Sequence, residues 1–182
     1  VWDIIKGKSD VIIAVLDTGL DWDEEEFGPI DSNTDNVFTN SPEDDWVTWT
    51  NPGSGNDTDD DSNNYIDDFR GWDFININTS GGGNQFSTDN DVRPNHTAFW
   101  HGNAVAGVIA AKTNNSEGVA GIAGGDASID KNGIKILPIK IADWGWDVFG
   151  NELVEWLSTA DVQKAICYAT DLDADVISMS FG

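Results

Sequence analysis

The stretch Asp10-Val-Ile-Ile-Ala-Val-Leu-Asp-Thr-Gly19 decides the fold class, because six consecutive apolar residues lead directly into Asp17. Apolar and polar residues do not alternate here, so both faces of the predicted strand should be buried, as in a parallel sheet covered by helices. Ligands of open α/β sheets bind beyond the carboxyl ends of such strands. The stretch therefore predicts an α/β fold with a parallel β-sheet flanked by helices, and it delivers a carboxylate to the edge where ligands bind.

Further segments fit the same fold class. Residues 101–112 combine small residues with apolar ones at helical spacing, which predicts a closely packed helix that begins at His101. Within a predicted strand at 134–141, Pro138 indicates a bulge or an unpaired amide. Besides these we expect a helix that starts at about 158–161 and a strand at 175–179, and we expect loop from 28 to about 95.

Composition limits the function classes. The chain has 182 residues, enough for one sizeable core, and its 33 acidic against 9 basic residues give a formal net charge of −24. Nucleic acids and anionic membranes are themselves negatively charged and would repel such a protein, so this charge argues against both as partners. No apolar run is long enough to span a bilayer. The single cysteine, Cys167, excludes an internal disulfide, and we expect it to be a small core residue.

An acidic segment within the predicted loop has the spacing of a calcium-binding loop. Oxygen donors recur at alternate residues from 59 to 67, and Asn64 stands where such loops turn sharply. The alternative is a solvated loop without a metal, the usual state of a charge run. An EF-hand does not fit, because Arg70 occupies the final ligand position and flanking helices are not evident. The predicted calcium ligands are Asp59, Asp61, Asn63, the carbonyl of Tyr65, and Asp67.

Asp17-Thr-Gly by itself is ambiguous, because aspartic proteases also carry an Asp-Thr-Gly after an apolar strand. That assignment needs a second such motif or a symmetric partner, and it gives His101 no role. Three segments decide otherwise. In this order, Leu16-Asp-Thr-Gly, His101-Gly-Asn-Ala-Val-Ala-Gly and Asp175-Val-Ile-Ser-Met-Ser-Phe-Gly182 resemble the subtilisin-like serine proteases, the subtilases of peptidase family S8. The resemblance runs from about residue 2 to residue 182.

The resemblance implies a three-layer subtilisin-like fold, incomplete at the C-terminus, in which Asp17 and His101 are the acid and base of a Ser-His-Asp triad. It implies that Ser180, Phe181 and Gly182 bind the extended backbone of a polypeptide substrate. The acidic string, followed by Gly71-Trp-Asp-Phe74, resembles a calcium-binding insertion at about 56–74. A weaker second calcium site is implied for Glu26 and Asn115. The family also implies a secreted, extracellular enzyme.

Two departures from the family pattern matter. Asn103 and Ala104 stand where the family usually has threonine and a second histidine. The nucleophile motif Gly-Thr-Ser-x-Ala is not present in residues 1–182, and Leu157-Ser-Thr-Ala160 does not match it. We therefore expect residues 1–182 to be part of a serine endopeptidase domain, inactive without the remainder of that domain. The alternative is a non-catalytic relative that acts as a calcium-dependent binding module.

Overall fold

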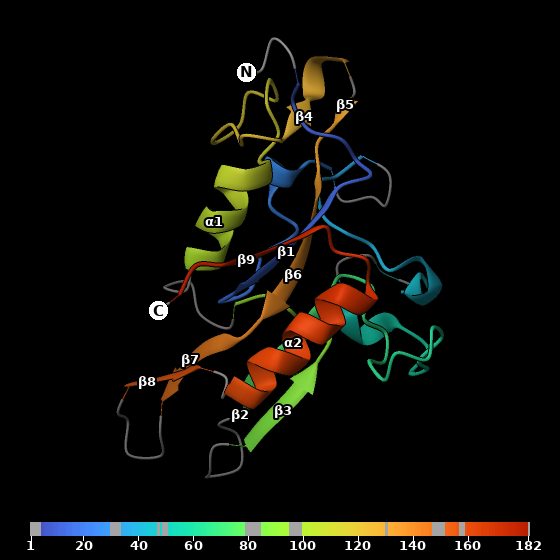
Figure 1. Ribbon diagram of the computed structural model, residues 1–182, viewed down its shortest axis with the longest axis vertical. Coiled ribbons are helices and arrows are strands. Elements are labelled where there is room, and N and C mark those ends of the chain that lie inside the picture. The colour runs from blue at the N-terminus through green and yellow to red at the C-terminus, as the bar shows by residue number, and fades with distance from the viewer. Residues whose placement is uncertain are drawn as a thin grey trace.

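The structure is a computed structural model, and its central feature is a five-stranded sheet with the strand order β3-β2-β6-β1-β9 (Figure 1). The strands β2, β6, β1 and β9 run parallel to one another, and β3 is antiparallel to β2. The structure describes residues 5–29, 34–46, 48, 51–78, 85–94, 100–129, 131–146, 152–156 and 159–181. The sheet strands are β1 (Ile12–Asp17), β2 (Trp72–Asn78), β3 (Gln85–Asp89), β6 (Lys135–Lys140) and β9 (Val176–Met179).

Two helices and several short elements complete the described fold. The helices are α1 (His101–Ala110) and α2 (Thr159–Asp171). Two antiparallel pairs lie outside the main sheet, namely β4 (Gly125–Asp126) with β5 (Lys131–Asn132) and β7 (Ala142–Trp146) with β8 (Glu152–Trp156). Short 3-10 helices are η1 (Glu25–Phe27), η2 (Ser41–Glu43), η3 (Pro52–Ser54) and η4 (Ala127–Ile129).

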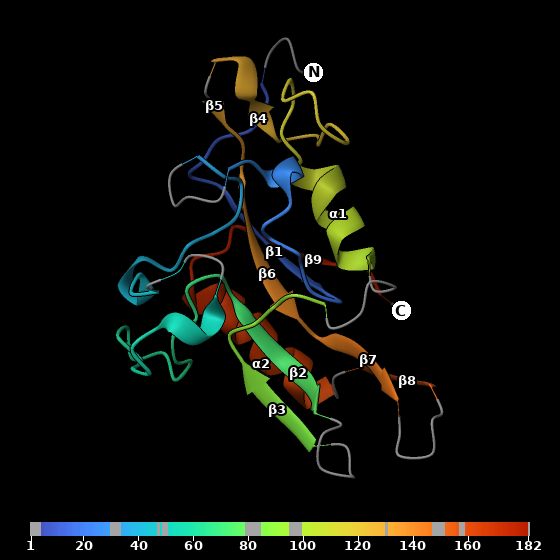
Figure 2. The ribbon, with the colours of Figure 1, turned by 180° about the vertical axis from the view of Figure 1, so that it is seen from behind.

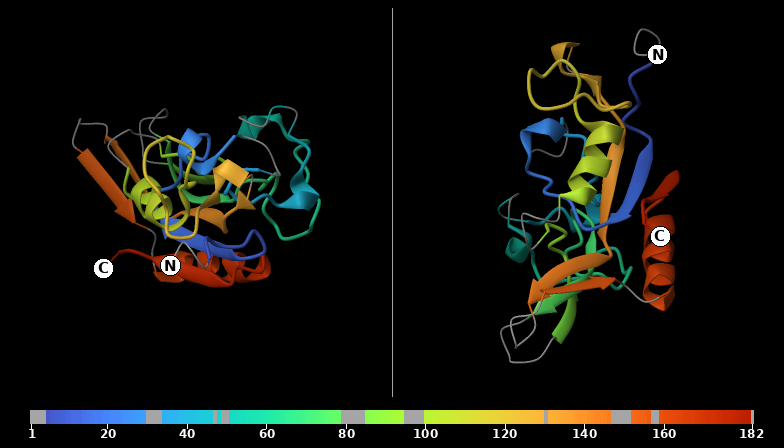
Figure 3. Two further views of the ribbon diagram at one scale, coloured as in Figure 1. Left: turned by 90° about the horizontal axis from the view of Figure 1, so that it is seen from above. Right: turned by 90° about the vertical axis from the view of Figure 1, so that its left-hand side faces the viewer.

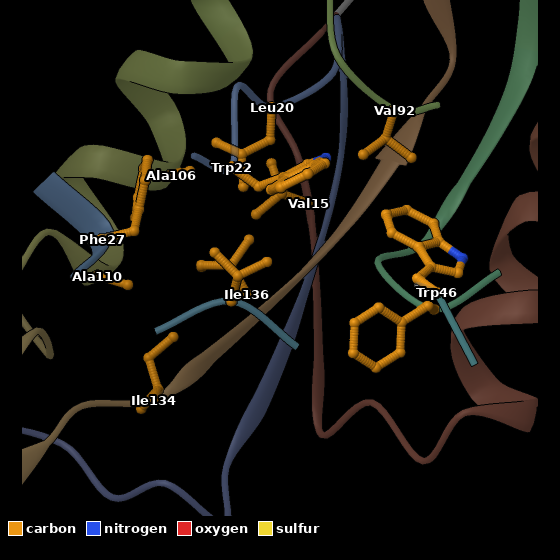
Figure 4. Close-up of a cluster of buried hydrophobic side chains, with 12 residues drawn as sticks. Val15, Leu20, Trp22, Phe27, Trp46, Val92, Ala106, Ala110, Ile134 and Ile136 are labelled. Atoms are coloured by element: carbon orange, nitrogen blue, oxygen red, sulfur yellow. The ribbon is translucent and has the colours of Figure 1, made fainter. Parts of the chain in front are cut away.

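The helices α1 and α2 cover opposite faces of the sheet, as Figure 2 and the right-hand view of Figure 3 show. On the α1 face, Val15 and Ile136 pack with Ala106 and Trp22 in one core cluster (Figure 4). On the α2 face, Leu16 and its neighbours pack with Tyr168 in a second cluster. Full burial of a valine, leucine or isoleucine side chain in these clusters contributes about 1.5–3 kcal/mol. The prediction of a strand buried on both faces is therefore confirmed, and with it the α/β class.

The expectation of loop from residue 28 to about 95 was wrong in part. Strand β2 adds to the main sheet beside β6, and β3 pairs with β2. The sequence of β2 contains Asp and Asn residues, as does the acidic segment before it, so its composition did not indicate a strand. The segment after Ile141 also contains the hairpin β7–β8. Cys167 is exposed rather than buried, because α2 directs Ala165, Tyr168 and Ala169 at the sheet instead.

Pro138 does not produce a bulge between β1 and β6. The parallel register runs through it without interruption and pairs Val15 with Pro138. Successive residues of a strand direct their amides to opposite neighbours, and the amide of Ile136 bonds to Asn36 on the side away from β1. The missing N–H of Pro138 therefore faces that side, before the pairing with β2 begins at Ile139. Among the described strands, none pairs with β6 at Pro138 on that side, so the sheet tolerates the proline.

Candidate functional site

Asp17 lies at the carboxyl end of β1 with only 2% of its surface exposed. Its Oδ1 atom accepts a hydrogen bond of 2.7 Å from the backbone N–H of Thr18. The chain then turns sharply at Gly19, whose φ of 97° favours glycine. A Cβ there would also collide with the carbonyl oxygen of Val92. The turn therefore holds a buried carboxylate in one orientation at the edge of the sheet.

His101 begins α1 and meets this carboxylate. Its Nδ1 atom lies 2.8 Å from Asp17 Oδ1, and its side chain is 51% exposed. When the imidazole is neutral, a carboxylate at Nδ1 favours the tautomer with hydrogen on Nδ1. Nε2 is then the basic nitrogen. The pair thus presents an accessible base that is oriented by a buried acid.

Two further contacts fix the start of α1 against the turn after β1. The backbone N–H of Gly102 donates to Thr18 Oγ1 at 3.0 Å, and a Cβ on Gly102 would collide with the carbonyl of Gly19. Asn103 Oδ1 accepts from the backbone N–H of Asp21 at 2.8 Å. Asn103, which departs from the family pattern, therefore anchors the helix to the turn. Sequence reasoning missed the roles of Thr18 and Asn103, since neither has a partner nearby in the sequence.

A buried ionic group lies at the same edge of the sheet. Lys140 Nζ lies 2.9 Å from Asp73 Oδ2 and 3.0 Å from Asp143 Oδ2, and each of these three side chains is at most 1% exposed. Burial raises the pKa of Asp73 well above its usual value, and Lys140 only partly offsets the effect. Burial also opposes the charge of Lys140, yet the two carboxylates raise its pKa. One ammonium therefore lies between two buried acidic side chains.

The raised pKa of Asp73 predicts a pH dependence of stability. Between its unfolded value of about 4 and its higher folded value, only the folded state binds the proton, so Asp73 makes the free energy of unfolding fall as pH rises. Asp73→Asn mimics the protonated acid and should remove this contribution. Urea denaturation from about pH 4 to pH 7 measures it. Asp91→Asn, at a part-exposed partner of Arg93, is the control. Equal slopes for wild type and Asp73→Asn would contradict the assignment.

The acidic loop gathers a cluster of carboxylates. Oxygen atoms of Glu43, Asp59 and Asp61 lie within 4.8 Å of one another. Sequence reasoning missed Glu43, which lies 16 residues before Asp59 in the short helix η2. Its carboxylate accepts hydrogen bonds from the amides of Asp60, Asp61 and Asp67 at 2.7, 3.0 and 3.1 Å. Burial raises the pKa of Glu43 to about 7. Such a set of hard oxygen donors fits a hard divalent cation.

The other predicted ligands surround this cluster differently. Asn63 adjoins it, since its Nδ2 donates to Asp61 Oδ2 at 3.1 Å and its Oδ1 accepts from the amide of Tyr65 at 2.7 Å. The Tyr65 ring packs against Tyr168 with a centroid distance of 4.7 Å. The carboxylate of Asp67 is engaged elsewhere, by the amides of Asn56 and Asp57 at 3.1 Å each. As predicted, Asn64 makes the sharp turn, with a φ of 74°.

The residues of the weaker predicted site border different hollows. Glu26 lies with Trp100 and Ile122 around one, and Asn115 lies with Lys112 and Thr34 around another. The loop at 112–118 wraps around Glu26. The amide of Lys112 donates to the backbone carbonyl of Glu26 at 2.7 Å, and the carboxylate of Glu26 lies against Gly118. Asn115 Oδ1 accepts from the amide of Glu117 at 3.3 Å.

The predicted substrate segment follows β9, the last strand of the sheet. Ser180 and Phe181 are exposed, with Phe181 at 37%, and Gly182 lies outside the described residues. Among the strands that the structure describes, β9 pairs only with β1. Val176 and Met179 on this strand are about half exposed, at 51% and 49%. Ser180 and Phe181 thus continue directly from a strand at one side of the described sheet.

Comparisons with known proteins fit this geometry. The chain matches the subtilase family, peptidase S8, over residues 8–182. A thermophilic serine proteinase of Bacillus sp. (strain AK1) is 28% identical over 181 residues, which is 100% of this chain and 28% of that protein. The chain thus spans under a third of the relative's length. None of the helices in the described ranges is long and apolar enough to cross a membrane. The family match covers nearly the whole chain, and the chain belongs to the subtilase family.

Proposed function

We propose that this chain supplies the acid and the base of a serine endopeptidase. The observation that carries the proposal is the 2.8 Å contact between His101 Nδ1 and Asp17 Oδ1, in which the acid is buried and the base is accessible. In such a triad the imidazole takes the proton of a serine hydroxyl and later gives it to the leaving amine. Asp17 holds the ring in the reactive tautomer and stabilises the imidazolium that forms. Membership of the subtilase family supports this assignment.

The nucleophile is proposed to lie in a segment that follows residue 182. A Gly-Thr-Ser-x-Ala motif does not occur in residues 1–182, and without a serine hydroxyl the imidazole has nothing to activate. Residues 1–182 would then form part of a catalytic domain and be inactive alone. The complete protein, which would contain this chain and the nucleophile segment, is the species in which activity should be measured.

The proposed substrate is an extended polypeptide that adds along the sheet beside Ser180, Phe181 and Gly182. Main-chain hydrogen bonds to a strand edge bind a peptide largely independently of its sequence. The position of Ser180 and Phe181 directly after β9, a strand of the main sheet, supports this placement. The net charge of −24 disfavours nucleic acid as a partner. We further propose that the protein acts outside the cell, as the family resemblance implies.

Calcium is the proposed cofactor of the acidic loop. The carboxylate oxygens would come from Glu43, Asp59 and Asp61. Asn63 would add a side-chain oxygen and Tyr65 a backbone carbonyl oxygen. The carboxylate of Asp67 now accepts hydrogen bonds from two amides and would have to give these up to bind the cation. The cation would neutralise carboxylates that otherwise repel one another and would join η2 to the loop at 59–65. For Glu26 and Asn115 we propose a second site, supported by the way the 112–118 loop wraps Glu26.

Removal of calcium is expected to lower the melting temperature. A cation at a hundredfold excess over its Kd stabilises the folded state by about 2.7 kcal/mol, and each kcal/mol shifts Tm by about 2–4 °C at this chain length. A chelator should therefore lower Tm by about 5–10 °C. Asp59→Asn and Asp61→Asn should abolish most of this difference, whereas Asp10→Asn, far from the loop in sequence, should leave it intact. A melting curve that a chelator does not change would exclude a calcium site in the loop.

Cleavage of an unfolded polypeptide tests the proposed function itself. The complete protein, incubated with a casein substrate, should generate new internal termini that mass spectrometry identifies. A non-catalytic binding module would retain the calcium-dependent Tm and leave the substrate intact. That outcome would reject the endopeptidase assignment while preserving the metal site.

A further inference from the structure

Lys140 stands beside Asp17 in the sheet, on the neighbouring strand. The parallel register pairs Asp17 of β1 with Lys140 of β6, and Lys140 with Asp73 of β2. Side chains at paired positions of neighbouring strands point to the same face. The three residues therefore form a row across three adjacent strands, on the face that α1 covers. Asp17 and Lys140 are the last residues of β1 and β6, and Asp73 is the second residue of β2.

The stem of Lys140 supports the turn that carries Asp17. A Cβ placed on Gly19 would lie 3.2 Å from Lys140 Cδ, so the turn rests directly on the methylene chain. On its other side the same turn is held by the segment at Val92, whose carbonyl accepts the amide of Leu20 at 3.0 Å. The turn is thus enclosed between Lys140, the 92–94 segment and the first residues of α1.

A lysine stem is a firm support only when its far end is fixed, because the free side chain has many rotamers. Here the ammonium is bound by Asp73 at 2.9 Å and by Asp143 at 3.0 Å, with Lys140 fully buried. The two carboxylates come from β2 and from β7, so the ammonium joins three strands beneath the turn. Charge-assisted hydrogen bonds of this kind are stronger than neutral ones and hold a defined geometry.

We propose that Lys140, fixed by Asp73 and Asp143, is the positioning residue of the Asp17–His101 pair. It touches neither the imidazole nor a reactant in this assignment. Its stem fixes the position of the Asp17–Gly19 turn relative to α1. In that position Asp17 Oδ1 contacts His101 Nδ1. Thr18 Oγ1 accepts a hydrogen bond from the amide of Gly102. The consequence for catalysis rests on the proposed function, but the geometric claim does not.

The test observes the hydrogen bond itself. In proton NMR of the calcium-loaded complete protein, the Nδ1 proton of His101 should give a low-field resonance, assigned by its absence in His101→Gln. Lys140→Met keeps the length of the stem and removes the ammonium, and it should abolish this resonance while circular dichroism shows a folded protein. The measurement uses no substrate, so its result does not depend on peptidase activity.

Lys135→Met is the matched control. Lys135 lies on the same strand and pairs with the buried Asp35, but it is at the opposite end of β6. Its loss should destabilise the fold without altering the His101 resonance. If Lys140→Met does not fold, the double variant Asp73→Asn and Asp143→Asn, which preserves shape and frees the ammonium, should weaken the resonance. An unchanged resonance in a folded Lys140→Met, or in the double variant, would overturn the proposal, and so would its equal loss in Lys135→Met.

Discussion

His101→Ala is expected to lower kcat of the complete protein by about a millionfold with a peptide substrate. A serine hydroxyl without its general base retains only the catalysis that substrate binding and oxyanion donors supply. Because His101 is assigned to proton transfer, its loss should appear in kcat, with KM little changed. Steady-state kinetics with a chromogenic peptide, and single-turnover measurements where turnover is slow, determine the ratio.

The chain offers a matched control in its other histidine, His96. His96 lies outside the described residues, and we expect it to be uninvolved. His96→Ala should therefore retain near wild-type kcat. Equal losses in the two variants, or a folded His101→Ala protein with wild-type kcat, would contradict the role of His101 as the base.

Asp17→Asn is expected to lower kcat about ten-thousandfold. The amide preserves the shape of the carboxylate, but it can present a donor to Nδ1 and so favour the tautomer in which Nε2 carries the hydrogen. It also removes the charge that stabilises the imidazolium. The change should be nearly isosteric in the buried turn, where Oδ1 accepts from Thr18 at 2.7 Å. Comparison of kcat with the melting temperature separates the catalytic loss from a loss of stability.

Asp21→Asn is the control for this substitution. Asp21 follows in the same turn, and its backbone amide, not its carboxylate, is held by Asn103. It should therefore retain most of the wild-type kcat. A loss as large in Asp21→Asn as in Asp17→Asn would indicate that the acidic turn as a whole, rather than one carboxylate, supports the reaction.

The parts of the fold that sequence reasoning predicted share a strong local pattern. The six apolar residues before Asp17 had no reasonable place except a strand buried on both faces, and β1 occupies the second position from the edge of the sheet. The small residues after His101 likewise indicated a close helix, and Gly102 lies against the Gly19 carbonyl. Asp17 ends the first pattern and His101 begins the second, and the resemblance to the subtilases predicted that the two residues act as a pair.

The parts that sequence reasoning missed depend on contacts between distant segments. Strand β2 forms because β6 offers an edge at Ile139 and Lys140, and polar residues within β2 obscure its period. Glu43 joins Asp59 and Asp61 only after η2 folds against the loop. Lys140 finds Asp73 across a strand pairing that had not been predicted. The spacing of residues within one segment carries no information about contacts with distant segments, so sequence patterns did not predict these contacts.

The structure shows that the acidic residues occupy two different environments, the solvent-exposed surface and the buried interior. Some carboxylates face solvent, but Asp35, Asp73 and Asp143 are buried against basic side chains. Removing one partner of a buried pair typically costs about 3–5 kcal/mol, because the other charge stays desolvated. A charge count alone therefore does not distinguish a solvated surface from an internal network.

Covalent labelling of the complete protein tests the central claim most directly, namely that Asp17 and His101 activate a serine. A fluorophosphonate reacts with an activated serine hydroxyl, and mass spectrometry identifies the residue that carries it. We predict a single label on a serine in the segment after residue 182, formed rapidly in the wild type and lost in His101→Ala. A folded wild-type protein that takes up no label, or a label that persists in His101→Ala, would contradict the account.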